Sequence, residues 1–232
     1  MPDPELAARV ADVRRRMAAA IERSGRSPSG ITLVAVSKTV DDDAVRAARD
    51  EGLTDFGESR AQALAARVAA DPPLGVRWHF VGRLQRNKVD LVLGPATLIH
   101  SVDRIPLAEA IAEQAAATRA VQRVLVQVNI SDDPDKGGFA ADETATAVAK
   151  IRELPGISVQ GLMTIPALDD DPDRAFSRMR ALRDDLRGRF PEVLHLSMGM
   201  SADFESAIEH GATIIRVGTA IFGPRGGGRD TD

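Results

Sequence analysis

Eight short strand-like runs alternate with stretches of helical periodicity along this chain of 232 residues, and the first of them, 31–36, is a run of aliphatic and β-branched residues. Runs without polar alternation are typical of strands that are buried on both faces, as in parallel sheets. Eight strand–helix units in a chain of this length predict an α/β fold, a single (β/α)₈ TIM barrel. The expected strands are 31–36, 55–57, 78–81, 98–102, 123–129, 157–163, 193–197 and 213–217.

A doubly wound open sheet is the structural alternative to the barrel. Such a sheet normally has a glycine-rich turn after its first strand, whereas the turn here is Ser37-Lys38-Thr39. The barrel is therefore the preferred prediction, with an extra N-terminal helix at 2–24. We expect one domain over 1–225, followed by a disordered tail at 226–232 that is rich in glycine.

Composition excludes several classes of function. A formal net charge of −4 gives no electrostatic case for binding nucleic acid. The basic cluster Arg14-Arg15-Arg16 is expected to be a solvated face of the N-terminal helix. The lack of cysteine excludes disulfides and thiolate metal sites. With neither a signal peptide nor a membrane-spanning run, we expect a cytoplasmic protein without a membrane partner.

Lys38 stands at the carboxyl end of the most apolar predicted strand, 31–36. Active sites of barrels are built at such strand ends, and we expect the amine to be desolvated there, which disfavours its charged form. An uncharged amine can attack a carbonyl and form a Schiff base. The alternative is a lysine that extends into solvent from the end of a strand.

The loops after the seventh and eighth strands predict a phosphate site. Phosphate-binding barrels favour these two loops, and here they are 197–201 and 218–223, both with glycines and a small hydroxyl residue. Free backbone N–H groups in such loops can bind a dianion. For either loop alone, tight turns and an N-cap role for Ser201 remain the preferred interpretation. Two such loops on adjacent strands favour phosphate binding.

Arg216 lies inside the eighth strand, and a charged residue in so apolar a run needs a partner. It is either one half of a structural ion pair or a donor to a ring nitrogen or an anion. His79, in the third strand, is interpreted as a core histidine with satisfied hydrogen bonds.

An amine, a phosphate site and a buried arginine together fit an aldehyde that carries a phosphate and a heteroaromatic ring. Pyridoxal 5′-phosphate is such a molecule.

Nine short motifs follow one another over nearly the whole chain: Leu33-Val-Ala-Val-Ser-Lys-Thr39, Phe56-Gly-Glu-Ser59, Trp78-His-Phe-Val-Gly82, Leu84-Gln-Arg-Asn-Lys88, Gln127-Val-Asn-Ile130, Lys136-Gly-Gly138, Gly161-Leu-Met-Thr164, Leu196-Ser-Met-Gly-Met-Ser201 and Arg216-Val-Gly-Thr-Ala-Ile-Phe-Gly223. In this order they resemble the pyridoxal phosphate homeostasis family, stand-alone relatives of the alanine racemase barrel domain. No single motif is decisive, but nine in sequence are highly specific.

The resemblance implies that Lys38 carries pyridoxal 5′-phosphate as a Schiff base and that Arg216 faces the pyridine nitrogen. It also implies phosphate contacts, mostly through backbone N–H groups, from Ser197, Gly199, Met200, Ser201, Gly218 and Thr219. Two positions depart from the family pattern. Ser59 replaces the usual asparagine, and Val40 replaces a second lysine close to the first. Lys136 is an alternative amine, although we expect it on an exposed loop, and Lys88 is a further candidate.

The chain has no tyrosine, whereas related racemases take their second base from a tyrosine of a C-terminal domain. We therefore predict a monomeric carrier that holds pyridoxal phosphate without turnover and passes it to pyridoxal-phosphate-dependent apo-enzymes. Such a carrier would support vitamin B6 and amino-acid balance. Two alternatives stay open: a narrow enzyme such as an amino-acid racemase or decarboxylase, and a cofactor-free Schiff-base aldolase.

Overall fold

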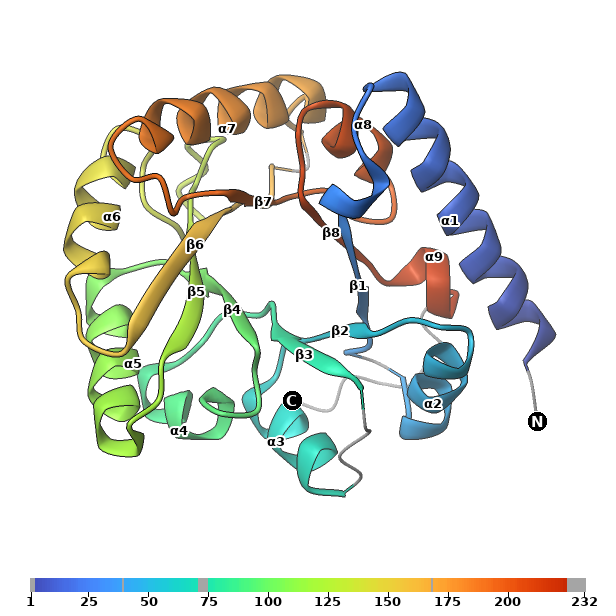
Figure 1. The fold of residues 1–232 in the computed structure, drawn as a ribbon, viewed down its shortest axis with the longest axis horizontal. Coiled ribbons are helices and arrows are strands. Elements are labelled where there is room, and N and C mark those ends of the chain that lie inside the picture. Colours follow the sequence, from blue (N-terminus) through green and yellow to red (C-terminus); the bar gives the residue numbers. More distant parts are fainter. Residues whose placement is uncertain (1–2, 39, 71–74, 168, 225–232) are drawn as a thin grey trace.

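The strands of this protein close into a parallel barrel, in which each is hydrogen-bonded to the next and β8 returns to β1 (Figure 1). The computed structural model describes residues 3–38, 40–70, 75–167 and 169–224. The predicted (β/α)₈ barrel is confirmed, and the predicted strands are present with ends shifted by no more than two residues. They are β1 (Thr32–Val36), β2 (Asp55–Glu58), β3 (Arg77–Phe80), β4 (Leu98–Val102), β5 (Gln122–Gln127), β6 (Ile157–Met163), β7 (His195–Ser197) and β8 (Ile214–Val217).

Helices surround the barrel as an outer ring (Figure 1). They are α1 (Pro4–Arg23), α2 (Asp42–Asp50), α3 (Ala61–Ala70), α4 (Val89–Val92), α5 (Ile105–Thr118), α6 (Thr144–Arg152), α7 (Pro172–Arg187), α8 (Phe204–Glu209) and α9 (Thr219–Phe222), with the short 3₁₀ helices η1 (Pro28–Gly30) and η2 (Arg86–Lys88). Among the described residues, none of these helices combines the length and the apolar character that crossing a bilayer requires. The predicted tail, 226–232, lies outside the described residues.

Local sequence explains where the first helices begin. The carboxylate of Asp3 accepts hydrogen bonds from the backbone N–H groups of Glu5 and Leu6, ahead of a proline at the first position of α1. Asp41 caps α2 in the same way by accepting from the N–H of Ala44 at 2.8 Å. These carboxylates satisfy N–H groups that have no partner within the first helical turn.

The predicted N-terminal helix is present as α1, and it lies beside α8 and α9 at the junction of β8 and β1 (Figure 1). Its apolar stripe includes the buried residues Val10 and Val13. The solvated face predicted for the arginine cluster is present at Arg14 and Arg15, which are exposed, whereas Arg16 is only partly exposed. Its Nε donates to Glu205 of α8 at 2.6 Å, and its guanidinium lies 4.6 Å from the ring centroid of Phe204. The sequence pattern identified the helix but not the partner that covers this arginine.

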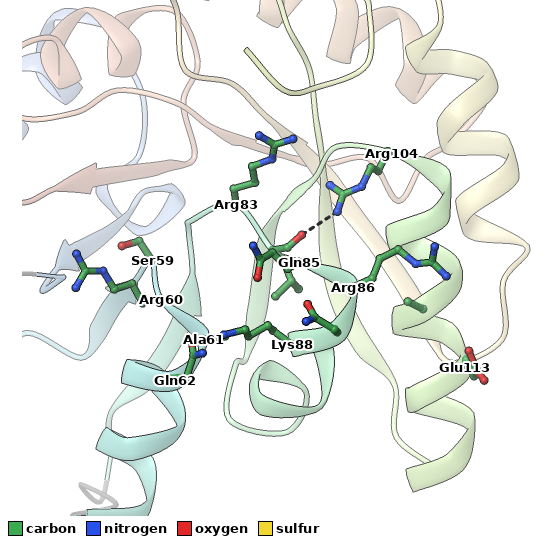
Figure 2. Close-up of a pocket in the computed structure, with 13 residues that line it drawn as sticks. Ser59, Arg60, Ala61, Gln62, Arg83, Gln85, Arg86, Lys88, Arg104 and Glu113 are labelled. Carbon is green, nitrogen blue, oxygen red and sulfur yellow. Dashed lines mark hydrogen bonds between the residues drawn. The ribbon is translucent and has the colours of Figure 1, made fainter. Parts of the chain in front are cut away.

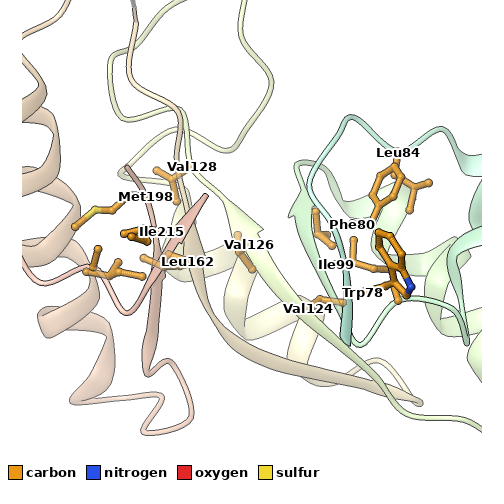
Figure 3. Packing of buried hydrophobic residues seen from close by; sticks show 14 of the residues in the cluster. Trp78, Phe80, Leu84, Ile99, Val124, Val126, Val128, Leu162, Met198 and Ile215 are labelled. Carbon is orange, nitrogen blue, oxygen red and sulfur yellow. The ribbon is translucent and has the colours of Figure 1, made fainter. Parts of the chain in front are cut away.

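The core has two layers because successive side chains of a strand point to opposite faces. Outward-pointing residues pack beneath the helices, as Figure 3 shows for Phe80, Ile99 and Val126. A second cluster lies inside the barrel and draws its buried members from five different strands: Val34, Leu98, Leu125, Met163 and Ile214. The interior of the barrel is thus filled by side chains.

Candidate cofactor-binding site

A cavity of about 740 Å³ opens at the carboxyl ends of the strands. This volume lies within the usual range for small-molecule sites, about 300–1,000 Å³. The cavity walls include six of the eight residues that the sequence predicts for cofactor binding: Lys38, Met200, Ser201, Arg216, Gly218 and Thr219. The other two, Ser197 and Gly199, do not line it.

Lys38 follows β1 by two residues, and its side chain is exposed. The expected desolvation of this amine is therefore wrong, because the residue reaches beyond the apolar strand into the open mouth of the cavity. Among the described residues, the amine forms no hydrogen bond or ion pair. Lys38 thus places its side-chain amino group at the cavity wall.

Arg216 is the third residue of β8 and is only 4% exposed. Its guanidinium donates from Nη1 to the hydroxyl of Ser197 at 2.6 Å and from Nη2 to the carbonyl of Thr164 at 2.9 Å. No carboxylate of the described residues pairs with it, so the ion-pair alternative is wrong. Burial lowers the pKa of Arg216 to about 10, against the opposing charge of Asp203. The side chain is still a cation at neutral pH, and it faces the cavity.

Ser197 and Gly199 form the layer beneath the cavity. The hydroxyl of Ser197 is buried and bridges Arg216 to Nδ1 of His100, which lies 2.8 Å away. Gly199 has φ +91°, and a Cβ at this position would lie 2.5 Å from the Cβ of Ala207 in α8. These two residues therefore position the guanidinium and the loop that line the cavity.

Ser201 connects the two loops that the sequence predicts for phosphate binding. Its hydroxyl accepts hydrogen bonds from the N–H groups of Gly218 and Ala220, each at 3.2 Å. The predicted N-cap role of Ser201 in the following helix is wrong, because α8 begins at Phe204 and Asp203 occupies its N-cap position. Ser201 instead holds the start of α9 against the loop that follows β7.

Free backbone donors remain in these loops. In the described part of the chain, the N–H groups of Ser201, Ala202 and Thr219 have no acceptor. The N–H of Met200 is already engaged, since it donates to the carboxylate of Asp203 at 2.6 Å. Several unengaged N–H groups that converge on one opening are suited to bind a phosphate.

Lys136 also lines this cavity and is partly buried, so the expectation of an exposed loop lysine is wrong. Its Nζ donates to the carbonyl of Ile165 at 3.3 Å and to that of Pro166. Since carbonyls engage this amine, it is less available for reaction than the amine of Lys38. Its positive charge nevertheless adds to the attraction of the cavity for an anion.

The two departures from the family pattern, Val40 and Ser59, both lie on the cavity wall. Val40 contributes apolar surface where a second amine is usual in the family. Ser59 contributes a small hydroxyl in place of an amide, and its backbone N–H donates to the carboxylate of Glu58 at 3.0 Å. The wall near Lys38 is therefore less basic than the family pattern implies.

A second, more open groove of about 1050 Å³ adjoins the cavity and shares Ser59 and Arg83 with it. Figure 2 shows its basic side chains, which come from the start of α3, the loop after β3 and the start of α5: Arg60, Arg83, Arg86, Lys88 and Arg104. Among the described residues that line the groove, Glu113 is the single acidic one. This groove was not predicted from the sequence, although the run 83–88, with three basic residues, indicated a local basic surface. For a chain with net charge −4, it is a local concentration of positive charge.

The cavity fits pyridoxal phosphate on three independent points. It has a free amine for a carbonyl carbon, a buried cationic donor for a ring nitrogen, and unengaged N–H groups for a phosphate. The chain is thus a parallel barrel whose C-terminal cavity is built for a phosphorylated carbonyl compound.

Comparison with known proteins identifies the family. The family model described as alanine racemase, N-terminal domain, matches residues 11–226. The chain is 42% identical over 221 residues to the pyridoxal phosphate homeostasis protein of Aquifex aeolicus, covering 94% of this chain and 97% of that one. It is 40% identical over 227 residues to the protein of the same name from Escherichia coli K12, covering 95% and 97%. The chain therefore belongs to the pyridoxal phosphate homeostasis protein family.

Solved structures agree with this assignment. PipY of Synechococcus elongatus, in a structure described as having pyridoxal phosphate bound, is 31% identical with a TM-score of 0.82, and the match covers 94% of this chain and all of PipY. A protein of unknown function from Bifidobacterium adolescentis gives a TM-score of 0.89 at 37% identity, covering 94% and 95%. Alanine racemase from Clostridium difficile shares the fold, with a TM-score of 0.72 at 14% identity, and is matched over 56% of its length.

Proposed function

We propose that this protein binds pyridoxal 5′-phosphate reversibly through Lys38 and supports intracellular vitamin B6 and amino-acid homeostasis. When bound, the cofactor supplies an aldehyde that condenses with an amine. The observation that carries the proposal is the free amine of Lys38, which opens into the same cavity as the buried cation of Arg216. The names of the relatives and the pyridoxal phosphate bound to PipY support it.

Each part of the cavity has a separate role in this proposal. Lys38 supplies the amine, and Arg216 donates a hydrogen bond toward the ring nitrogen. The loops around Met200, Ser201, Gly218 and Thr219 bind the phosphate, mainly through backbone N–H groups. Ser197 and Gly199 act from beneath the cavity. Ser197 holds the guanidinium of Arg216, and Gly199 lets the loop after β7 pack against α8. Residues 1–225 would form one cofactor-binding domain.

We propose further that the protein holds the cofactor without turnover. A guanidinium stays protonated at neutral pH, so Arg216 can only donate to the ring nitrogen and discourages protonation there. An unprotonated pyridine ring is a weaker electron sink for carbanion chemistry. The chain also contains no tyrosine to serve as the second base of a racemase. A carrier fits these features better than an amino-acid racemase.

The protein would act as a monomer in the cytoplasm and would pass the cofactor to pyridoxal-phosphate-dependent apo-enzymes. The basic groove beside the cavity supports the transfer to a protein partner. It shares Arg83 with the cavity and offers Arg86 and Lys88 to an acidic protein surface. Complementary charge accelerates encounter and orients partners.

Titration of the protein with pyridoxal phosphate, followed by absorbance, tests the binding function. We expect a yellow band that saturates at one equivalent and that Lys38→Ala abolishes while the protein stays folded. Lys150→Ala is the matched control, since Lys150 is an exposed lysine on α6 away from the cavity. An unchanged band in Lys38→Ala would contradict the proposal. Racemisation or decarboxylation of several amino acids by the loaded protein would favour the enzyme alternative.

Transfer to an apo-enzyme tests the partner proposal. The double variant Arg86→Glu, Lys88→Glu should transfer bound cofactor to an apo-aminotransferase more slowly, with the largest loss at low salt. The double variant Lys150→Glu, Arg187→Glu, at exposed residues of α6 and α7, controls for the change in net charge because it also replaces two cations by two anions. Equal transfer rates for all three proteins would remove the groove from the proposal and leave cofactor binding intact.

A further inference from the structure

A continuous line of hydrogen bonds crosses the interior of the barrel from the cavity to the start of β2. Nη1 of Arg216 donates to the hydroxyl of Ser197 at 2.6 Å, and this hydroxyl lies 2.8 Å from Nδ1 of His100. Nε2 of His100 lies 2.9 Å from Nδ1 of His79, and Nε2 of His79 lies 3.0 Å from Oδ1 of Asp55. Five side chains from five strands are thus connected in series.

One assignment of protons satisfies every bond of this chain with both imidazoles neutral. A guanidinium can only donate and a carboxylate can only accept. In this assignment Ser197 accepts from Arg216 and directs its own proton to Nδ1 of His100. His100 then carries its proton on Nε2 and donates it to Nδ1 of His79, which in turn donates from Nε2 to Asp55. Both imidazoles are therefore neutral and in the same tautomer.

Burial supports this assignment of protons. His100 is fully buried, and its pKa is lowered well below the usual range, chiefly by burial, to which the nearby cation of Arg216 adds. A neutral His100 keeps the chain satisfied, because each of its ring nitrogens has a partner.

The far end of the chain is a stabilised carboxylate. Burial alone would raise the pKa of Asp55, but hydrogen bonds from His79, Arg77 and Thr54 outweigh it and lower the pKa. Arg77 donates to both carboxylate oxygens, at 2.8 and 2.6 Å, and its side chain reaches solvent. Asp55 is the first residue of β2, so this carboxylate lies at the end of the strand remote from the cavity.

We propose that Asp55, His79, His100 and Ser197 are positioning residues for the cofactor: they hold Arg216 as an oriented, charged donor, and through them the distant carboxylate influences the bound ring. This inference rests on the proposed binding of pyridoxal phosphate. Hydrogen bonds in series polarise one another, and the effect is strongest where water is excluded. A negative charge at one end of the chain therefore stabilises the positive charge at the other.

The tautomers can be measured without any cofactor. In long-range ¹H–¹⁵N spectra of the unliganded protein at neutral pH, His79 and His100 should both be neutral and protonated on Nε2. Asp55→Asn should move the Nε2 proton signal of His79 upfield, because an amide is a weaker acceptor than a carboxylate. An Nδ1 proton on His100, or a doubly protonated ring at either residue, would overturn the chain.

A double-mutant cycle on the loaded protein tests the influence on the cofactor. Asp55→Asn should lower the pH midpoint at which the yellow form of the bound cofactor titrates, because the chain then ends on a weaker acceptor and polarises Arg216 less. In a Ser197→Ala background, where the chain is broken beside Arg216, the same substitution should have no measurable effect. Asp50→Asn, at an exposed carboxylate, is the control and should leave the midpoint unchanged.

Each outcome of this cycle decides the inference. An equal effect of Asp55→Asn in both backgrounds would indicate a field that acts through space and would overturn transmission along the chain, and no effect in either background would overturn it as well. Urea unfolding of each variant confirms that the comparison is made on folded protein. If the unaltered protein fails to bind pyridoxal phosphate, the proposed function fails, while the tautomer measurement still tests the chain by itself.

Discussion

The Gly199→Ala substitution tests how the loop beneath the cavity is held. With φ at +91°, an alanine here would adopt the left-handed region at a cost of about 1–2 kcal/mol. Its Cβ would also lie 2.5 Å from the Cβ of Ala207 and 3.0 Å from the Cα of Phe204, so α8 or the loop has to move. Overpacking of this kind typically costs about 1–3 kcal/mol. The expected loss in the free energy of unfolding is therefore about 2–5 kcal/mol.

Gly94 supplies a matched control, because it has φ +93° and a Cβ there would meet no atom within 4 Å. Gly94→Ala should carry only the backbone cost, about 1–2 kcal/mol. Urea unfolding of both variants gives the difference between their free energies of unfolding. We expect this difference to be about 1–3 kcal/mol, which is the packing contribution alone. Gly199→Ala should also bind pyridoxal phosphate more weakly than Gly94→Ala. Equal losses of stability in the two variants would refute the close packing of this loop against α8.

Two further predictions concern the polar contacts of the barrel. Because the pKa of Asp55 is lowered in the folded state, its stabilising effect is present above the unfolded pKa of about 4 and is lost as the pH falls toward the folded value. Urea unfolding from pH 6 to pH 2 should therefore show a steeper acid loss for the parent than for Asp55→Asn, and parallel curves would contradict this. Ser201→Ala leaves two N–H groups without their acceptor and should cost about 1–2 kcal/mol, with weaker cofactor binding. An unchanged unfolding midpoint would show that water replaces the hydroxyl.

The sequence was sufficient to predict the barrel because eight strand-like runs alternate with helical stretches, and because several of the strands are buried on both faces and rich in apolar residues. Runs such as 98–102 and 157–163 match the observed strands at both ends. His79 was correctly interpreted as a satisfied core histidine, since Asp55 and His100 bind its two ring nitrogens. Its partners come from β2 and β4, and nothing in the local pattern of β3 could identify them.

The details of the site were less predictable because they depend on side-chain direction beyond the strand ends. Lys38 is two residues past β1, so its exposure follows from the path of the loop and not from the apolar run before it. Lys136 is bound by carbonyls at the end of β6, a contact between segments far apart in the sequence. Ser201 was expected to cap the helix that follows it, whereas the closed barrel brings it to the start of α9.

The most direct test of the central claim is to identify the residue that carries the cofactor. The protein is loaded with one equivalent of pyridoxal phosphate, reduced with borohydride, digested and analysed by mass spectrometry. We predict a single modified peptide in which Lys38 bears the reduced cofactor. Modification of Lys136 or Lys88, with Lys38 left unmodified, would contradict the assignment of the cavity amine.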